Sequence, residues 1–314
     1  MDLARDRLRV TALAGGTGAA KLIRGLGATL GQRHLTIVGN TGDDAEVWGL
    51  HVSPDLDTVT YALAGLLDVA QGWGRSGESF HCLESMAALG AETWFNLGDR
   101  DLATHLARTR ALRQGQPLSR VTAAIARSLG VTARILPMSD DPVRTRLRTP
   151  DRWLTFQEYF VREKTLVEVL EVAYEGALGA RPAPGVVEAL RETDLVVVCP
   201  SNPVTSIGPP LAVPGIVDAL RTTRAPVVAV SPIMGTAAVS GPAADLMRAR
   251  GLDVSPAGVA AAYAPWLRTL VLDRRDHAEV PALVGRGVTP VLTDIVMTDR
   301  ESEIALARAV LGLA

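Results

Sequence analysis

The stretch Leu35-Thr-Ile-Val-Gly-Asn-Thr-Gly-Asp-Asp44 gives the clearest indication of the fold. Its first four residues are apolar or β-branched, which is typical of a strand buried within a parallel sheet. The chain then turns polar at Gly39, so Asp43 and Asp44 are expected at the carboxyl end of this strand. In open α/β sheets, ligands bind at this edge. The stretch therefore predicts a buried parallel strand followed by an acidic ligand-binding loop.

Two more aspartates follow in Ser53-Pro-Asp-Leu-Asp-Thr58, ahead of a segment to Leu67 that has the apolar spacing of a helix. Asp55 and Asp57 are therefore expected near a helix N-terminus, where one aspartate often serves only as a cap. Four acids in one strand-loop-helix unit instead favour a site for a divalent metal or a hydroxyl-bearing substrate. Hard cations such as Mg²⁺ prefer carboxylate oxygens, which makes Mg²⁺ the natural candidate.

Apolar runs of the same kind recur along the chain and alternate with helical segments. The expected strands cover residues 8–14, 35–38, 133–137, 194–199, 225–231, 269–273 and 291–294. This alternation predicts a single α/β domain over residues 1–314, with a doubly wound, Rossmann-like, mostly parallel sheet and helices on both faces. Residues 143–149 and 153–160 alternate as antiparallel strands do. They predict a hairpin inserted into the core, within an insertion of about 143–182 whose flanks are helical or irregular.

A glycine-rich turn, Gly15-Gly16-Thr17-Gly18, lies between the first strand and a helix that contains Lys21. Glycines let the backbone approach a ligand closely, and the N–H groups of a helix N-terminus favour anions. The glycine spacing matches neither the Walker A motif nor the dinucleotide fingerprint. The turn therefore predicts either a phosphate or nucleotide contact or simply a tight turn. The loop at Ser201 and Asn202 offers further small donors after a buried strand.

The segment Asn96-Leu-Gly-Asp-Arg-Asp101 starts apolar and enters a helix rich in arginine and alanine. Asp99, Arg100 and Asp101 fit either a solvated capping cluster or a group that orients a substrate, with Arg100 as an anion clamp. His105 further along this helix is expected to be a surface or packed histidine rather than a catalytic base.

The bulk properties exclude several classes of function. The 314-residue chain has a net charge of −2 and no basic block, so no nucleic-acid partner is expected. Two lone cysteines, Cys82 and Cys199, indicate a reducing cytoplasm. We find neither a signal peptide nor an apolar run near the ~20 residues of a membrane span. Acids, glycine turns and small donors together favour metal-assisted phosphoryl or phosphodiester transfer over covalent or redox catalysis.

These motifs, in this order over residues 10–300, resemble the 2-phospho-L-lactate transferase family of coenzyme F-420 biosynthesis, some of whose bacterial members are phosphoenolpyruvate transferases. The matching stretches are Gly15–Gly18, Asn40–Asp44, Ser53–Thr58, Leu97–His105, Leu136–Asp141, Phe156–Phe160, Pro200–Pro209, Ser231–Gly235 and Ser240–Ala243.

The resemblance implies a Mg²⁺-dependent reaction between two small molecules, in a cytoplasmic homodimer of the family type. The acceptor is the deazaflavin Fo (7,8-didemethyl-8-hydroxy-5-deazariboflavin), whose terminal hydroxyl attacks phosphorus. The donor is lactyl-2-diphospho-5′-guanosine or its enolpyruvyl analogue, and GMP leaves. The implied residues are Asp43 and Asp57 for the metal and catalysis, Asp57, Asn96, Asp99 and Arg100 for Fo, and Gly15, Gly16, Thr17, Gly18, Lys21, Ser201 and Asn202 for the nucleotide.

Asp57 is additionally expected to orient or deprotonate the acceptor hydroxyl. One departure from the family pattern is Asn96, where some archaeal members carry lysine, so the Fo contact there can differ. The pair Asp43-Asp44 resembles members that use the enolpyruvyl donor. Two alternatives are a non-catalytic nucleotide-sugar-binding regulator of the same fold and an NAD-dependent oxidoreductase. The acids in Ser53–Thr58 and the glycine spacing speak against them.

Overall fold

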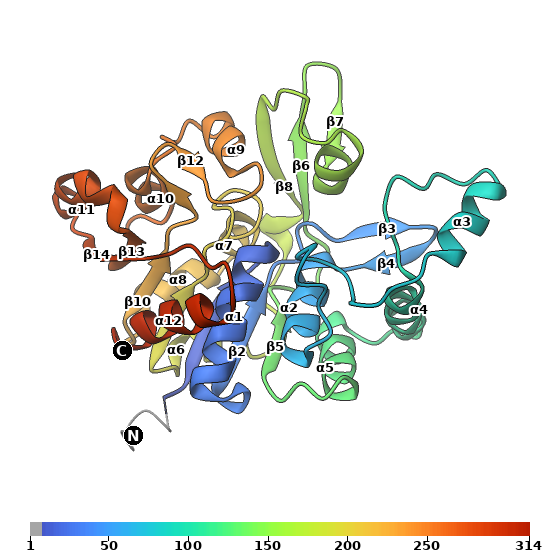
Figure 1. The fold of residues 1–314 in the computed structure, drawn as a ribbon, viewed down its shortest axis with the longest axis horizontal. Coiled ribbons are helices and arrows are strands. Elements are labelled where there is room, and N and C mark those ends of the chain that lie inside the picture. The colour runs from blue at the N-terminus through green and yellow to red at the C-terminus, as the bar shows by residue number, and fades with distance from the viewer. Residues whose placement is uncertain (1–7) are drawn as a thin grey trace.

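The computed structural model describes residues 8–314, and a seven-stranded sheet forms its centre (Figure 1). The strand order is β14-β13-β10-β9-β1-β2-β5, and neighbouring strands are parallel throughout. The strands are β1 (Val10–Ala14), β2 (Leu35–Gly39), β5 (Arg134–Pro137), β9 (Leu195–Val198), β10 (Val227–Val230), β13 (Thr269–Asp273) and β14 (Thr289–Thr293). The doubly wound, mostly parallel sheet expected from the sequence is therefore confirmed.

The strands are apolar at nearly every position because both faces of the sheet are covered. In β9, Leu195 and Val197 pack into the core on one face, and Val196 and Val198 pack into the core on the other. The first core is closed by α1 (Gly16–Leu30), α2 (Pro54–Ala64), α5 (Leu118–Ser128) and α12 (Arg300–Leu311). The second is closed by α6 (Val186–Arg191), α8 (Ile216–Thr222), α9 (Ala243–Ala249) and α10 (Pro256–Ala262).

The direction of winding reverses next to β1. The chain passes from β1 to β2 and β5 on one side, and later builds β9, β10, β13 and β14 on the other. The turns that leave β1 and β9 therefore diverge to opposite faces of the sheet and leave a crevice at the strands' carboxyl ends. This switch point is where doubly wound proteins bind their ligands.

Three small antiparallel sheets lie outside the main sheet. The largest contains β7 (Trp153–Thr155), β6 (Arg144–Arg148) and β8 (Glu171–Glu175), in that order. The others pair β3 (Ala45–Val47) with β4 (Leu50–Val52), and β11 (Ile233–Met234) with β12 (Ala237–Ala238).

The inserted hairpin is present, but two details of its prediction were wrong. Its second strand ends at Thr155, and Glu158–Arg162 forms a π-helical turn instead. Phe156 and Phe160 stack with ring centroids 5.5 Å apart, and a spacing of four residues suits a helix as well as an alternating strand. The flank expected to be helical or irregular contains β8, which pairs with β6.

The segment between α2 and α4 (Asp99–Arg113) forms an arm that extends to one side of the molecule (Figure 1). Its helix α3 (His81–Ala88) has no buried residue. The remaining helices are α7 (Gly208–Ala212) and α11 (Val280–Gly285), with short 3₁₀ turns at Gln32–His34, Ala177–Gly179 and Arg274–Glu279. Within residues 8–314, the structure contains no helix with the length and hydropathy needed to cross a membrane.

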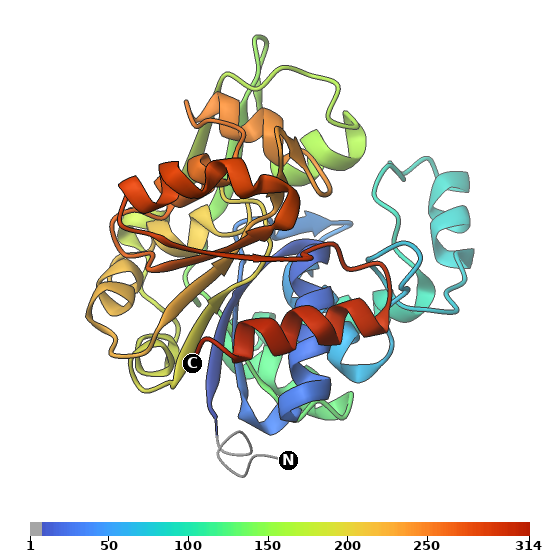
Figure 2. The same cartoon turned by 60° about the vertical axis from the view of Figure 1, so that its left-hand side comes forward.

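Figure 2 shows α12 lying across α1, and Gly25 is where the two helices meet. A Cβ on Gly25 would lie 2.2 Å from the carbonyl oxygen of Glu303. We expect Gly25→Ala to lower the free energy of unfolding by about 1–3 kcal/mol, because the backbones must separate. Denaturant unfolding measures this loss.

The control is Gly285→Ala, at an exposed helical glycine with nothing within 4 Å of the added carbon. This change should be neutral or stabilising, since alanine is the better helix former. Equal effects of the two substitutions would contradict the close-packing argument.

Candidate active site

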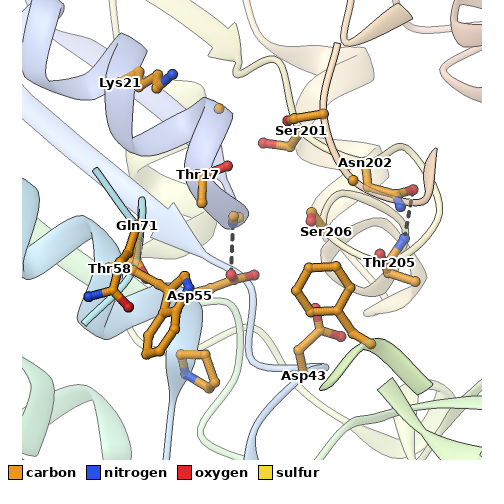
Figure 3. Close-up of a pocket in the computed structure, with 18 of the residues that line it drawn as sticks. Thr17, Lys21, Asp43, Asp55, Thr58, Gln71, Ser201, Asn202, Thr205 and Ser206 are labelled. Atoms are coloured by element: carbon orange, nitrogen blue, oxygen red, sulfur yellow. Dashed lines mark hydrogen bonds between the residues drawn. The ribbon is translucent and has the colours of Figure 1, made fainter. Parts of the chain in front are cut away.

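The turn after β1 lies against the loop after β9 at the switch point. Figure 3 shows Thr17 and Lys21, which follow β1, and Ser201 and Asn202, which follow β9, around the pocket beside this contact. A Cβ on Gly15 would lie 2.7 Å from the Cβ of Ser206, and one on Gly18 would lie 2.3 Å from the carbonyl oxygen of Pro200. Glycine is therefore required at both positions by the approach of one chain segment to another. This contact gives the glycines a packing role, in addition to the tight turn and the phosphate contact that the sequence left open.

A cavity of about 710 Å³ opens beside this contact, within the usual size range of small-molecule sites. It is lined by most of the residues that the sequence singled out. These are Gly15, Gly16, Thr17, Gly18, Lys21, Asp43, Asp57, Asn96, Ser201 and Asn202. Residues from five separate stretches of the chain thus meet in one place at the switch point.

Lys21 lies on the cavity wall, but its ammonium group already has a partner. Its Nζ donates a hydrogen bond of 3.0 Å to the carbonyl oxygen of Met297. Residues 295–298 also line the cavity, so Lys21 ties the segment between β14 and α12 to the glycine turn. A ligand phosphate would have to share or replace this bond.

Three buried aspartates lie close to the glycine turn, and two of them, Asp43 and Asp55, line the cavity. Asp55 accepts a 2.7 Å hydrogen bond from the backbone N–H of Gly16 and a 2.9 Å bond from the side-chain amide of Asn40. Asp44 accepts a hydrogen bond from the hydroxyl of Ser53 and contacts the ring of His51, each at 2.9 Å. Asp43 has a buried Oδ1 with no hydrogen-bond partner among the described residues.

Two of these acids, Asp43 and Asp55, have raised pKa values. Burial is the largest cause for both Asp43 and Asp55, and the neighbouring carboxylates add to it. The pKa of Asp55 is raised to about 6, and that of Asp43 is raised well above its usual range. A cation bound nearby would lessen the repulsion among these carboxylates.

Asp57 lies in a different environment, because an arginine balances its charge. Both of its oxygens accept hydrogen bonds from the guanidinium of Arg108, one of them at 2.9 Å from Nη1. The side chains of Asp57, Asp101 and His105 form the one described group of at least three residues whose spacing could hold a metal. Asp43 is not part of that group, although it lines the same cavity. The pairing of Asp43 with Asp57 at one metal ion stays a prediction.

Asp99 and Arg100 do not line the cavity that the described residues form. The carboxylate of Asp99 accepts hydrogen bonds from the backbone N–H groups of His81 and Cys82 and so caps α3. The carboxylate of Glu78 accepts from the backbone N–H groups of Arg100 and Asp101 and so caps α4. Asp99, the first residue of α4, thus caps α3, and Glu78, in the loop before α3, caps α4. This is the capping alternative considered from the sequence, here joining the arm to α4.

Aromatic residues that the sequence reasoning missed form two walls of the cavity. Trp73 and Phe95 come from the arm, and Phe156 and Phe160 come from the inserted sheet and its helical turn. Gln157 between them donates a 3.2 Å hydrogen bond to the carbonyl oxygen of Asp43. The stacked phenylalanines at a spacing of four were a usable signal for a helical turn. No local pattern indicated which residues faced the site.

These features place the chain among doubly wound α/β proteins whose ligand site is the switch-point crevice. The model of the family described as 2-phospho-L-lactate transferase CofD matches residues 10–308. The chain therefore belongs to this family and is a transferase.

Named relatives support the assignment over nearly the full length. A phosphoenolpyruvate transferase of Kitasatospora aureofaciens is 44% identical over 98% of both chains. A 2-phospho-L-lactate transferase of Methanosarcina acetivorans is 43% identical, covering 96% of this chain and 97% of the other. A crystal structure of a UPF0052-family protein from Bacillus halodurans shares the fold, with a TM-score of 0.66 and 19% identity over 97% of this chain and 99% of that one.

The raised pKa of Asp55 makes a prediction about stability without metal. The carboxyl of Asp55 has a pKa of about 6 in the folded protein and about 4 in the unfolded chain. The folded state therefore binds this proton more tightly than the unfolded state does. Its contribution to the free energy of unfolding is fully present below about pH 4 and is lost as the pH rises through about 6. In EDTA, lowering the pH from 7 to 5 should therefore raise the Tm, and Asp43 acts in the same direction.

Asp55→Asn removes one of the two carboxyl groups whose pKa is raised. The rise in Tm between pH 7 and pH 5 should therefore be smaller in this variant. Thermal unfolding of both proteins across this pH range measures the difference. An unchanged pH dependence in Asp55→Asn would contradict the raised pKa.

The reciprocal capping predicts that Asp99→Ala frees the N-terminus of α3. Hydrogen exchange of residues 81–88 should then become several-fold faster, because two backbone N–H groups lose their acceptor. Glu84→Ala on the same helix is the matched control, since Glu84 is 76% exposed and its ion pair is with His81 alone among the described residues. Equal exchange in the two variants would exclude a capping role for Asp99.

Proposed function

We propose that the protein joins Fo to a phospho-acid taken from a guanylylated donor, with release of GMP, in the biosynthesis of coenzyme F-420. The observation that carries this proposal is the convergence of the family's motif stretches, including Gly15–Gly18, Ser53–Thr58 and Ser201–Asn202, on one cavity. Family membership decides against the regulator and the NAD-dependent oxidoreductase considered from the sequence.

The walls of the cavity support a flat acceptor beside a polar donor. Trp73, Phe95, Phe156 and Phe160 offer aromatic faces of the kind that pack against a fused ring system. The glycine turn and the hydroxyl and amide groups of Ser201 and Asn202 suit a diphosphate and a ribose. We therefore assign the deazaflavin to the aromatic side, near Asn96, and the guanylyl group to the glycine side.

In this reaction the terminal hydroxyl of Fo attacks the phosphorus that carries the acyl group. A phosphorus–oxygen bond forms to Fo, the bond to the GMP oxygen breaks, and the hydroxyl proton leaves to a base or to water. Asp57 accepts a hydrogen bond from the attacking hydroxyl and so orients it. Its pairing with Arg108 holds the carboxylate in place for this role.

We propose Mg²⁺ as the metal, held by Asp43 and Asp57. The orphaned Oδ1 of Asp43 and the second lone pair on each Asp57 oxygen leave acceptor sites free for it. When bound, the ion would neutralise charge on the diphosphate and the leaving group. Asp55 and Asp44 add negative charge nearby. A homodimer and a cytoplasmic location, which the family resemblance implies, stay predictions.

The test is a mass-spectrometric assay with Fo, Mg²⁺ and either the lactyl or the enolpyruvyl guanylyl donor. We expect one donor to give a phosphodiester product and GMP. Relatives named for both acyl groups are 44% and 43% identical, so both donors must be tried. Fo binding without product from either donor would reject the donor class, and absence of Fo binding would reject the acceptor.

Asp57→Asn should nearly abolish turnover in this assay while the protein stays folded, because the amide cannot replace the carboxylate toward metal and hydroxyl. Asp140→Asn is the matched control. Asp140 accepts hydrogen bonds from Ser119 and does not line the cavity within the described part of the chain. Near-normal turnover in Asp57→Asn would refute the assignment.

A further inference from the structure

Arg108 on α4 is the largest fully buried side chain of the described residues, with 1% of its surface exposed. Its two terminal nitrogens face the two carboxylate oxygens of Asp57, which is the planar, two-point arrangement that a guanidinium forms with a carboxylate. Nη1 also donates a 3.4 Å bond to the carbonyl oxygen of His51. Arg108 therefore joins α4 to both the β4 hairpin and the first turn of α2.

Arg108 itself does not line the cavity that we describe, so substrate does not reach it. Asp57, which it holds, does line the cavity, and the backbone N–H of Asp57 is fixed by a 2.9 Å bond to the carbonyl oxygen of Ser53. The backbone of Asp57 is thus set by the helix start and its carboxylate plane by Arg108. The remaining lone pairs of the carboxylate point away from the guanidinium.

A second ring of contacts surrounds the pair. His105 Nδ1 lies 3.3 Å from Nη1 of Arg108, so this ring nitrogen is the acceptor and Nε2 carries the hydrogen. Nε2 then faces Asp101 Oδ2 at 3.4 Å, and Asp101 accepts a 2.5 Å bond from the hydroxyl of Tyr61. These contacts link α2 and α4 at the cavity wall and limit how far Arg108 can move.

We propose that Arg108 is a positioning residue for the transfer reaction, one that fixes the Asp57 carboxylate in the orientation needed by the acceptor hydroxyl. A buried ion pair is weak evidence for stability, because desolvation of both charges opposes their attraction. The pair can nevertheless matter for the reaction rate, because a displacement of a reacting group by about 1 Å can lower the rate roughly a hundredfold. This inference rests on the proposed function of the cavity.

The test compares Arg108→Lys with the wild type in the two-donor assay. Lysine keeps the charge but offers one bonding point instead of a fork, so the carboxylate can rotate. We expect kcat to fall about 10- to 100-fold, while the KM for Fo changes by less than about threefold. Arg108→Met also removes the charge, so its kcat should be lower still.

Arg24→Lys is the matched control, because Arg24 is also paired with a buried carboxylate, Glu303, and does not line the large cavity of the described structure. It should change the Tm without lowering kcat. If Arg24→Lys and Arg108→Lys slow the enzyme equally, or if Arg108→Lys fails to fold, the arginine serves only the fold and the proposal is overturned.

A double-mutant cycle separates the two roles further. If Arg108 acts through Asp57, then adding Arg108→Lys to Asp57→Asn should lower the residual rate by less than about twofold. An additive loss would overturn the proposal. Absence of product from the wild type would reject the proposed function itself, whereas normal wild-type turnover with undiminished kcat in Arg108→Lys would reject the positioning role alone.

Discussion

The turn after β1 lies against the loop after β9 with no room for a side chain between them, and the site depends on this contact. Gly15 and Gly18 bring the N-terminus of α1 to Ser206 and Pro200. The same approach brings the backbone N–H of Gly16 to Asp55, so that the glycine turn is also bonded to the acidic cluster. A cavity with a polar floor follows from the position of two turns at the reversal of the sheet.

The charges around the cavity are balanced unevenly. Asp57 has Arg108 against both oxygens, whereas burial raises the pKa of Asp43 and of Asp55, and neighbouring carboxylates raise both further. The first arrangement fixes a carboxylate in place. The arrangement of Asp43 and Asp55 is electrostatically unfavourable when both are charged, and a bound cation would stabilise it. Adjacent acids of one sequence motif can thus have different physical roles because their distant neighbours differ.

Two additions to the sheet complete the cavity. The arm between α2 and α4 supplies Trp73 and Phe95, and it is attached to α4 through the exchange of caps between Glu78 and Asp99. The inserted sheet supplies Phe156 and Phe160, and it is attached to the acidic loop through Gln157 and through the bond from Thr145 N–H to the Gly42 carbonyl. The sheet thus provides the polar floor, and the additions provide apolar walls.

The sequence by itself determined the parallel sheet, because runs such as Leu195–Val198 are apolar on both faces and such strands must be covered on both sides. It also determined that Asp43, Asp57, Gly15–Gly18 and Ser201 would meet, since the carboxyl ends of parallel strands share one edge. Tertiary structure alone decided the partners of those residues. Arg108 lies 51 residues from Asp57 and Glu78 lies 22 from Arg100, and no local periodicity encodes contacts over such separations. For that reason the sequence left capping and substrate binding open for Asp99 and Arg100 and did not indicate which helix Asp99 caps, and the arginine behind Asp57 was not foreseen.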